Sequence, residues 1–106
     1  MFIHAVLFKV LPGEVKKYRK DSKMWASYAK KAKGFIAYFT MQRFAYKNQY
    51  VSIYEWKNKA NHDRFMKKYH DWLKGKSRAK VKVLGYYNLK ALDKLYWQIT
   101  RIVLIY

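Results

Sequence analysis

The hydrophobic and polar positions of this chain predict four strands and two helices. The runs Phe35 to Phe44 and Tyr50 to Trp56 are rich in aromatic and β-branched residues and flank a polar turn. Such residues suit a pleated, half-buried surface, so the pair predicts an antiparallel hairpin. Phe2 to Leu11 alternates but is apolar on both faces, which predicts a strand covered on both sides. Val81 to Leu89 has the composition of a fourth strand.

Two other segments repeat their apolar positions at the helical spacing of three and four residues. From Glu14 to Lys33 these positions form one stripe, and Gly34 follows where a left-handed cap commonly ends a helix. A second helix is predicted from about Lys59 to Leu73, with Asn58 as the residue whose side chain caps its free backbone N–H groups. The resulting order predicts an α+β fold, a ferredoxin-like βαββαβ sandwich with both helices on one face of a four-stranded antiparallel sheet.

Residues 1–89 are predicted to form one domain, and residues 90–106 form an apolar tail. The run from Leu95 to Tyr106 has β-type composition and is shorter than the ~20 residues that a membrane-spanning helix needs. It could add an edge strand, pack across a subunit boundary, or promote aggregation if it were exposed. We favour packing against protein.

The two helices would leave the other face of the sheet bare. We place on that face six aromatic residues of the strands: Phe35, Phe39, Tyr50, Tyr54, Trp56 and Tyr87. Because a large exposed apolar patch marks an interface or a ligand site, two sheets are expected to pack face to face. The sequence therefore predicts a homodimer.

The formal net charge of +18 indicates nucleic acid or an anionic surface as a partner. However, 19 of the 24 basic residues are lysine, and they are spread along the chain. Nucleic-acid readers more often use arginine in a concentrated patch. We therefore interpret most of the lysines as a solvated surface, and keep binding of nucleic acid or an anionic surface as the alternative.

Cysteine is absent, which excludes disulfides, thiolate metal sites and a cysteine nucleophile. The three histidines lack the spacing of common metal motifs, so no metal is predicted. The first four residues lack the basic lead of a signal peptide, and no apolar run approaches ~20 residues. We expect a cytoplasmic protein that does not span a membrane.

Three segments carry a family resemblance: FIHAVLFKVLPGEVKKY, GFIAYFTMQRF and YVSIYEWKNKANHDRFM. Over residues 2–89 the chain resembles the antibiotic biosynthesis monooxygenase-like family of dimeric α+β barrels, which implies dimerisation through the sheets. That superfamily also includes haem-degrading enzymes and polyketide cyclases. The haem-degrading members use Asn, Trp and His at positions that correspond to Val6, Phe65 and Gly75 here, which argues against that activity. The resemblance implies a cofactor-free oxygenase that binds flat aromatic molecules.

His4, on a largely apolar strand face, is the candidate general base, since the unperturbed pKa of histidine is near 6.5. The alternative is a histidine at the edge of the core, bonded to backbone. Five residues are candidates for a substrate pocket between sheet and helices, although each could be plain core: Trp25, Tyr38, Tyr54, His62 and Tyr69. The predicted function is a cofactor-independent, monooxygenase-like enzyme for a small hydrophobic or aromatic substrate. The alternative is a non-enzymatic dimeric module that binds a ligand, nucleic acid or an anionic surface.

Overall fold

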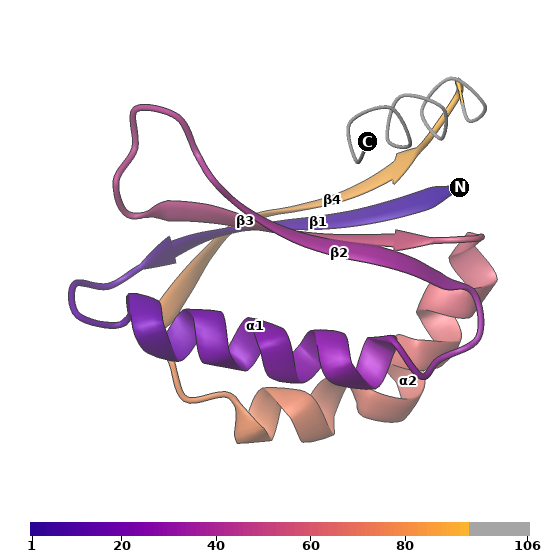
Figure 1. Cartoon of the computed structure of the whole chain (residues 1–106), viewed down its shortest axis with the longest axis horizontal. Coiled ribbons are helices and arrows are strands. Elements are labelled where there is room, and N and C mark those ends of the chain that lie inside the picture. The colour runs from indigo at the N-terminus through magenta and orange to yellow at the C-terminus, as the bar shows by residue number, and fades with distance from the viewer. Residues whose placement is uncertain (94–106) are drawn as a thin grey trace, which may run out of the picture.

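The computed structural model describes residues 1–93, which form one sheet and two helices (Figure 1). The elements follow the order β1 (Phe2–Val10), α1 (Val15–Ala29), β2 (Phe35–Gln42), β3 (Gln49–Trp56), α2 (Lys59–Lys76) and β4 (Val81–Lys90). The predicted βαββαβ sandwich is confirmed. The predicted apolar run from Leu95 lies outside the described residues. Within residues 1–93 no helix is long and apolar enough to cross a membrane.

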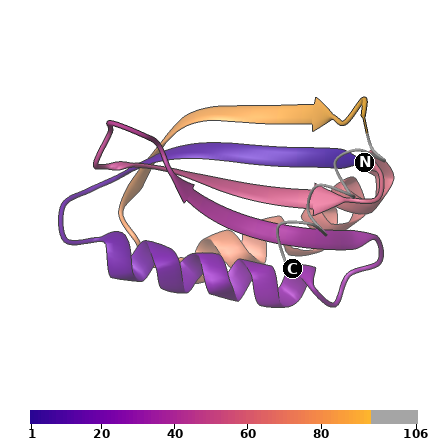
Figure 2. The same cartoon turned by 45° about the horizontal axis from the view of Figure 1, so that its top comes forward.

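The sheet has the strand order β2-β3-β1-β4, with every neighbouring pair antiparallel. Both helices lie on the same face of it, which we call the inner face (Figures 1 and 2). β1 occupies the middle and pairs with β3 on one side and β4 on the other. Its register places His4 opposite Tyr54 of β3 and opposite Asn88 of β4. Three polar side chains therefore lie in one row across the sheet.

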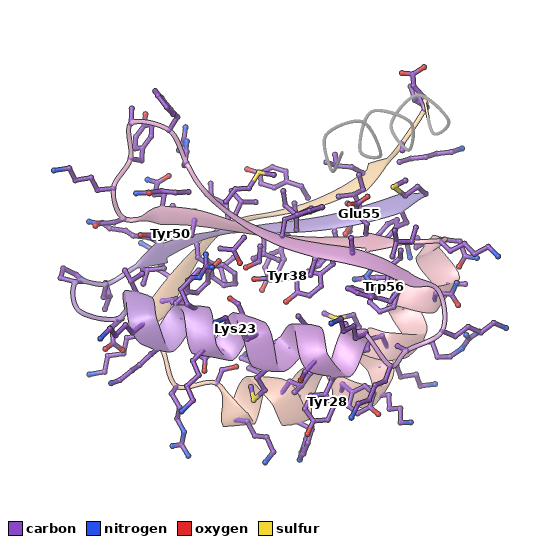
Figure 3. The ribbon with its side chains drawn as sticks, in the orientation of Figure 1. Lys23, Tyr28, Tyr38, Tyr50, Glu55 and Trp56 are labelled. Atoms are coloured by element: carbon purple, nitrogen blue, oxygen red, sulfur yellow. The ribbon has the colours of Figure 1, made fainter. Side chains whose placement is uncertain are left out.

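The prediction that the bare face carries six aromatic residues is wrong for four of them: Phe35, Tyr50, Tyr54 and Trp56. The ring of Tyr50 lies 5.5 Å from that of Tyr18 on α1, and the ring of Trp56 lies 5.3 Å from that of Phe65 on α2. Figure 3 shows Tyr38 and Trp56 between the sheet and the helices, with Glu55 on the opposite side. These aromatic residues are instead part of the packing between the two layers.

The sequence predicted the start of α2 correctly but placed the end of α1 too late. α1 ends at Ala29 rather than at Lys33, because the chain continues in tight turns in which the N–H groups of Lys31 and Ala32 bond carbonyls three residues earlier. The expected left-handed Gly34 is present at φ +83°, but it precedes β2 and does not cap α1 directly. The predicted cap of α2 is confirmed, since Asn58 Oδ1 accepts the backbone N–H of Asn61 at 3.0 Å.

Candidate functional site

A cavity of about 320 Å³ lies between the inner face of the sheet and the two helices. We call it the sheet–helix cavity. Its lining is mainly aromatic and aliphatic, with residues from β1, β3, β4, both helices and the loop 77–80. Its volume lies near the lower end of the range of small-molecule sites, roughly 300–1,000 Å³. Four of the predicted site residues line it: His4, Trp25, Tyr54 and His62.

His4 projects from the middle strand into this cavity and is only 8% exposed. Its Nδ1 donates a hydrogen bond to Oδ1 of Asn88 at 2.8 Å, with the amide oriented as in the structure. Among the described residues no group bonds its second ring nitrogen, Nε2. Burial lowers the pKa of His4, the Asn88 bond raises it in part, and the nearby His62 and His70 lower it further. His4 is therefore a neutral imidazole at neutral pH.

His62 reaches the same cavity from the first turn of α2, which Asn58 caps. Its side chain packs against the rings of Phe2 and Trp56, at centroid distances of 4.9 and 6.1 Å. Its Nδ1 bonds Oδ1 of the adjacent Asp63 at 3.0 Å. Its Nε2 is buried and has no hydrogen-bond partner among residues 1–93.

Two tyrosines that line the cavity, Tyr18 and Tyr54, have hydroxyl groups with raised pKa values. The hydroxyl of Tyr18 bonds Oγ of Ser52 at 2.7 Å, and burial raises the pKa of Tyr18. Burial also raises the pKa of Tyr54 well above its ordinary value. Both phenols are neutral at physiological pH, so they offer the cavity flat rings and neutral hydroxyl groups.

The loop 77–80 closes one side of the cavity and is fastened to α1. Asp21 accepts the backbone N–H groups of Arg78 and Ala79, the latter at 2.8 Å. Trp25 Nε1 donates to Oγ of Ser77 at 2.9 Å. These bonds fix the indole of Trp25 as part of the lining and occupy the carboxylate of Asp21.

The remaining two predicted pocket residues lie outside the lining. Tyr38 packs against the ring of Tyr54 at 4.8 Å and faces a separate hollow between α1 and β2. Tyr69 lies between the helices, with its ring 5.6 Å from that of Tyr28. Tyr38 therefore contacts a residue of the lining, Tyr54, without lining the cavity itself. Tyr69 belongs to the packing between α1 and α2.

Sequence reasoning missed Asn88 and Tyr86 of β4. Asn88 holds His4, and the ring of Tyr86 stacks on that of His4 at 6.1 Å. Both residues become apparent only when the register between the first and fourth strands is known, because that register decides which cross-strand neighbours share a face. Within the described chain no group of three or more metal-ligating side chains is present.

No protein-family model and no curated protein matches this chain. Among solved structures, it is similar to SnoaB, a cofactor-independent oxygenase from Streptomyces nogalater, with a TM-score of 0.70 and 14% identity over 87% of this chain and 93% of that one. An antibiotic biosynthesis monooxygenase matches with a TM-score of 0.68 and 14% identity, over 88% and 100%. MupZ from Pseudomonas fluorescens matches with a TM-score of 0.71 and 7% identity, over 98% and 83%. The predicted resemblance is confirmed at the level of the fold.

Proposed function

We propose, from this shared fold and from the chemistry of the cavity, that the chain is a cofactor-independent oxygenase for a small, flat aromatic substrate. One observation carries the proposal: the imidazole of His4 is neutral, is held by Asn88 through one nitrogen, and has its other nitrogen free in an aromatic cavity. A positioned histidine of this kind is a suitable general base. The rings of Trp25 and Tyr54 would hold the flat substrate beside it.

The reaction that suits this site is the oxidation of an activated CH₂ group to a carbonyl by O₂. His4 Nε2 takes a proton as a C–H bond breaks, and the electron pair stays on the substrate carbon. That carbanion reduces O₂ and forms a C–O bond. The resulting peroxide loses water as the second C–H bond and the O–O bond break. CH₂ plus O₂ gives C=O plus H₂O, so the substrate supplies all of the electrons and no other reductant is required.

A direct test uses anthrone, a flat three-ring ketone whose CH₂ group is acidic. We expect the purified protein, without added flavin or metal and with a chelator present, to accelerate O₂ uptake above the rate in buffer. One anthraquinone should form per O₂ consumed. With ¹⁸O₂, the label should appear in the new carbonyl and in water. Oxygen uptake and mass spectrometry of the product measure both quantities.

The matched control for this assay is Lys67→Gln, an exposed position of α2 away from the cavity, which should leave the rate unchanged. A rate equal to that of buffer across a series of CH-acidic aromatic ketones would contradict the oxygenase. Saturable binding of anthrone without O₂ uptake would favour the ligand-binding alternative.

We also propose that the chain forms a homodimer through the sheet face opposite the helices. Alternation along the strands places Met41, Tyr87 and Leu89 on that face, and all three are about half exposed. Such exposed apolar residues on one sheet face are typical of an interface. A symmetric pair of copies would cover the face with itself.

Sedimentation analysis should give twice the chain mass of 12.9 kDa. Because a buried lysine without a partner is costly, Leu89→Lys should shift the equilibrium to monomer. Phe44→Lys is the control, since Phe44 is 97% exposed and lies beyond the end of β2. Dissociation by both variants, or by neither, would contradict this interface.

A further inference from the structure

His4 and His62 form a pair inside the sheet–helix cavity. One comes from the middle strand and the other from α2, and both are 8% exposed. Their ring centroids are 4.7 Å apart with an angle of 43° between the planes. Two imidazolium ions at this distance in a buried site would repel each other strongly. The nearness of His62 is accordingly one of the causes that lower the pKa of His4, after burial.

The Nδ1 atoms of the two histidines have hydrogen-bond partners of different charge. Nδ1 of His4 bonds the neutral amide of Asn88, whereas Nδ1 of His62 bonds the carboxylate of Asp63. The pKa of Asp63 is lowered, first by the hydrogen bond from Lys59 and then by the one from His62, so this carboxylate is ionised at neutral pH. A negative partner stabilises an imidazolium, and a neutral one does so much less. Of the two histidines, only His62 therefore has a bonded partner within residues 1–93 whose charge complements an imidazolium.

The Nε2 atom of His62 has no hydrogen-bond partner among residues 1–93. This nitrogen is buried, and His62 lines the cavity that His4 also lines. A buried polar atom without a hydrogen bond is costly, and a bound molecule that supplies the bond removes the cost. A substrate oxygen beside His4 would supply it. This arrangement presents a base and an acid to the same molecule.

We propose that His62 is a second catalytic residue, the general acid that works with the base His4, and that Asn88 and Asp63 are positioning residues. This inference rests on the proposed oxygenase function. His4 takes the proton from the substrate carbon, O₂ adds to the carbanion, and His62 gives its Nε2 proton to the terminal oxygen of the peroxide anion. The second C–H proton then leaves with the OH group of the hydroperoxide as water, and the proton that His4 took passes to His62 to restore the starting state. The protons and electrons balance with O₂ as the oxidant.

The surroundings of the pair determine how it responds to pH. The titratable groups beside the two rings and along the cavity are Tyr18, Tyr54, Asp63, Tyr86, His70, Asp21 and Lys74, and Lys59 bonds Asp63. The oxygens of Asp21 are occupied by backbone N–H groups of the loop 77–80. Among the described residues, Asp63 is therefore the carboxylate that contacts the histidine pair. It is half exposed, so solvent screens part of its effect.

The first test is independent of turnover. In ¹⁵N-labelled protein at pH 7, NMR of the imidazole nitrogens should show a protonated Nε2 on His62 and an unprotonated Nε2 on His4. His62→Gln should raise the pKa of His4, because it removes a neighbouring positive charge. An unprotonated Nε2 on His62, or no change at His4, would overturn the pairing, whether or not anthrone is oxidised.

The second test uses turnover of anthrone by the full chain. The rate should have a bell-shaped pH profile, and His62→Gln should remove its alkaline limb and lower kcat by about 10²-fold, the lower end of what proton transfer contributes. Asp63→Asn should move the alkaline limb to lower pH, since the imidazolium loses its carboxylate. Asp71→Asn is the matched control, because Asp71 bonds the adjacent His70 at the same 3.0 Å but is fully exposed and away from the pair. An unchanged alkaline limb in His62→Gln would overturn the role of His62. If the wild-type protein shows no turnover, the oxygenase fails, and the NMR result still decides how the pair holds its proton.

Discussion

Replacing His4 with glutamine should lower kcat for oxygen uptake by about 10²–10⁴-fold, the range that a positioned general base contributes. Glutamine has a similar length, and its amide can still donate to Asn88 Oδ1, but it has no basic nitrogen. The fold should remain, since no charge is buried and the strand is kept. Oxygen uptake with anthrone measures the rate, and circular dichroism with thermal unfolding measures the fold.

The pH profile distinguishes a chemical role of His4 from a structural one. Burial lowers the pKa of His4 below the ordinary value near 6.5, so the acid limb of the wild-type kcat/KM profile should lie below that value, where the imidazole becomes charged. His4→Gln should lose this acid limb together with the rate. A variant that kept wild-type kcat, or kept the same acid limb, would contradict the assignment of His4 as the base.

The fold was predictable because the helical spacing, the cap residue and the strand alternation all indicate the same elements. The helical stripe from Val15, the Asn58 cap and the alternating strand from Phe2 all predict elements that the structure contains. The end of α1 was misplaced, since Lys30 to Lys33 continue in tight turns that have nearly helical spacing. Boundaries of this kind depend on hydrogen bonds that composition does not reveal.

The two sheet faces could not be told apart from hydrophobicity. Tyr50, Tyr54 and Trp56 share one face of β3, and Val51 and Ile53 share the other. Because both sets are apolar, the alternation does not say which set faces the helices. Packing decides this, since the larger rings fill the space between the sheet and α1.

The site was predictable in part for the same reason. His4 and His62 each lie on an apolar face of their own element, and the sandwich brings those faces together. Tyr69 could not be separated from the pocket by sequence, because its neighbour Phe65, one turn earlier on α2, does line the cavity. Asn88 was missed, since the register of β1 and β4 is what places it beside His4.

Gly34→Ala should destabilise the fold by about 3 kcal/mol or more, which combines the roughly 1–2 kcal/mol of a left-handed backbone with a displaced buried amide worth about 1–3 kcal/mol. Gly34 has φ +83°, and a Cβ there would lie 2.8 Å from the Cβ of Asn61 and closer still to its amide. Asn61 is buried in the first turn of α2 and accepts a bond from Arg64. The substitution would therefore push on the turn that holds His62. Denaturant unfolding monitored by circular dichroism measures the change.

Gly13→Ala separates the two contributions to that loss. Gly13 has a nearly equal φ of +79°, but no atom lies within 4 Å of the position that its Cβ would take. It should lose only the backbone term, about 1–2 kcal/mol. Asn61→Ala should recover part of the loss in a double variant with Gly34→Ala, because the clashing amide is gone, so the double variant should lose less stability than the sum of the two single losses. Equal losses for the two glycines, with no recovery, would mean that Gly34 serves only its backbone conformation and does not position the turn that holds His62.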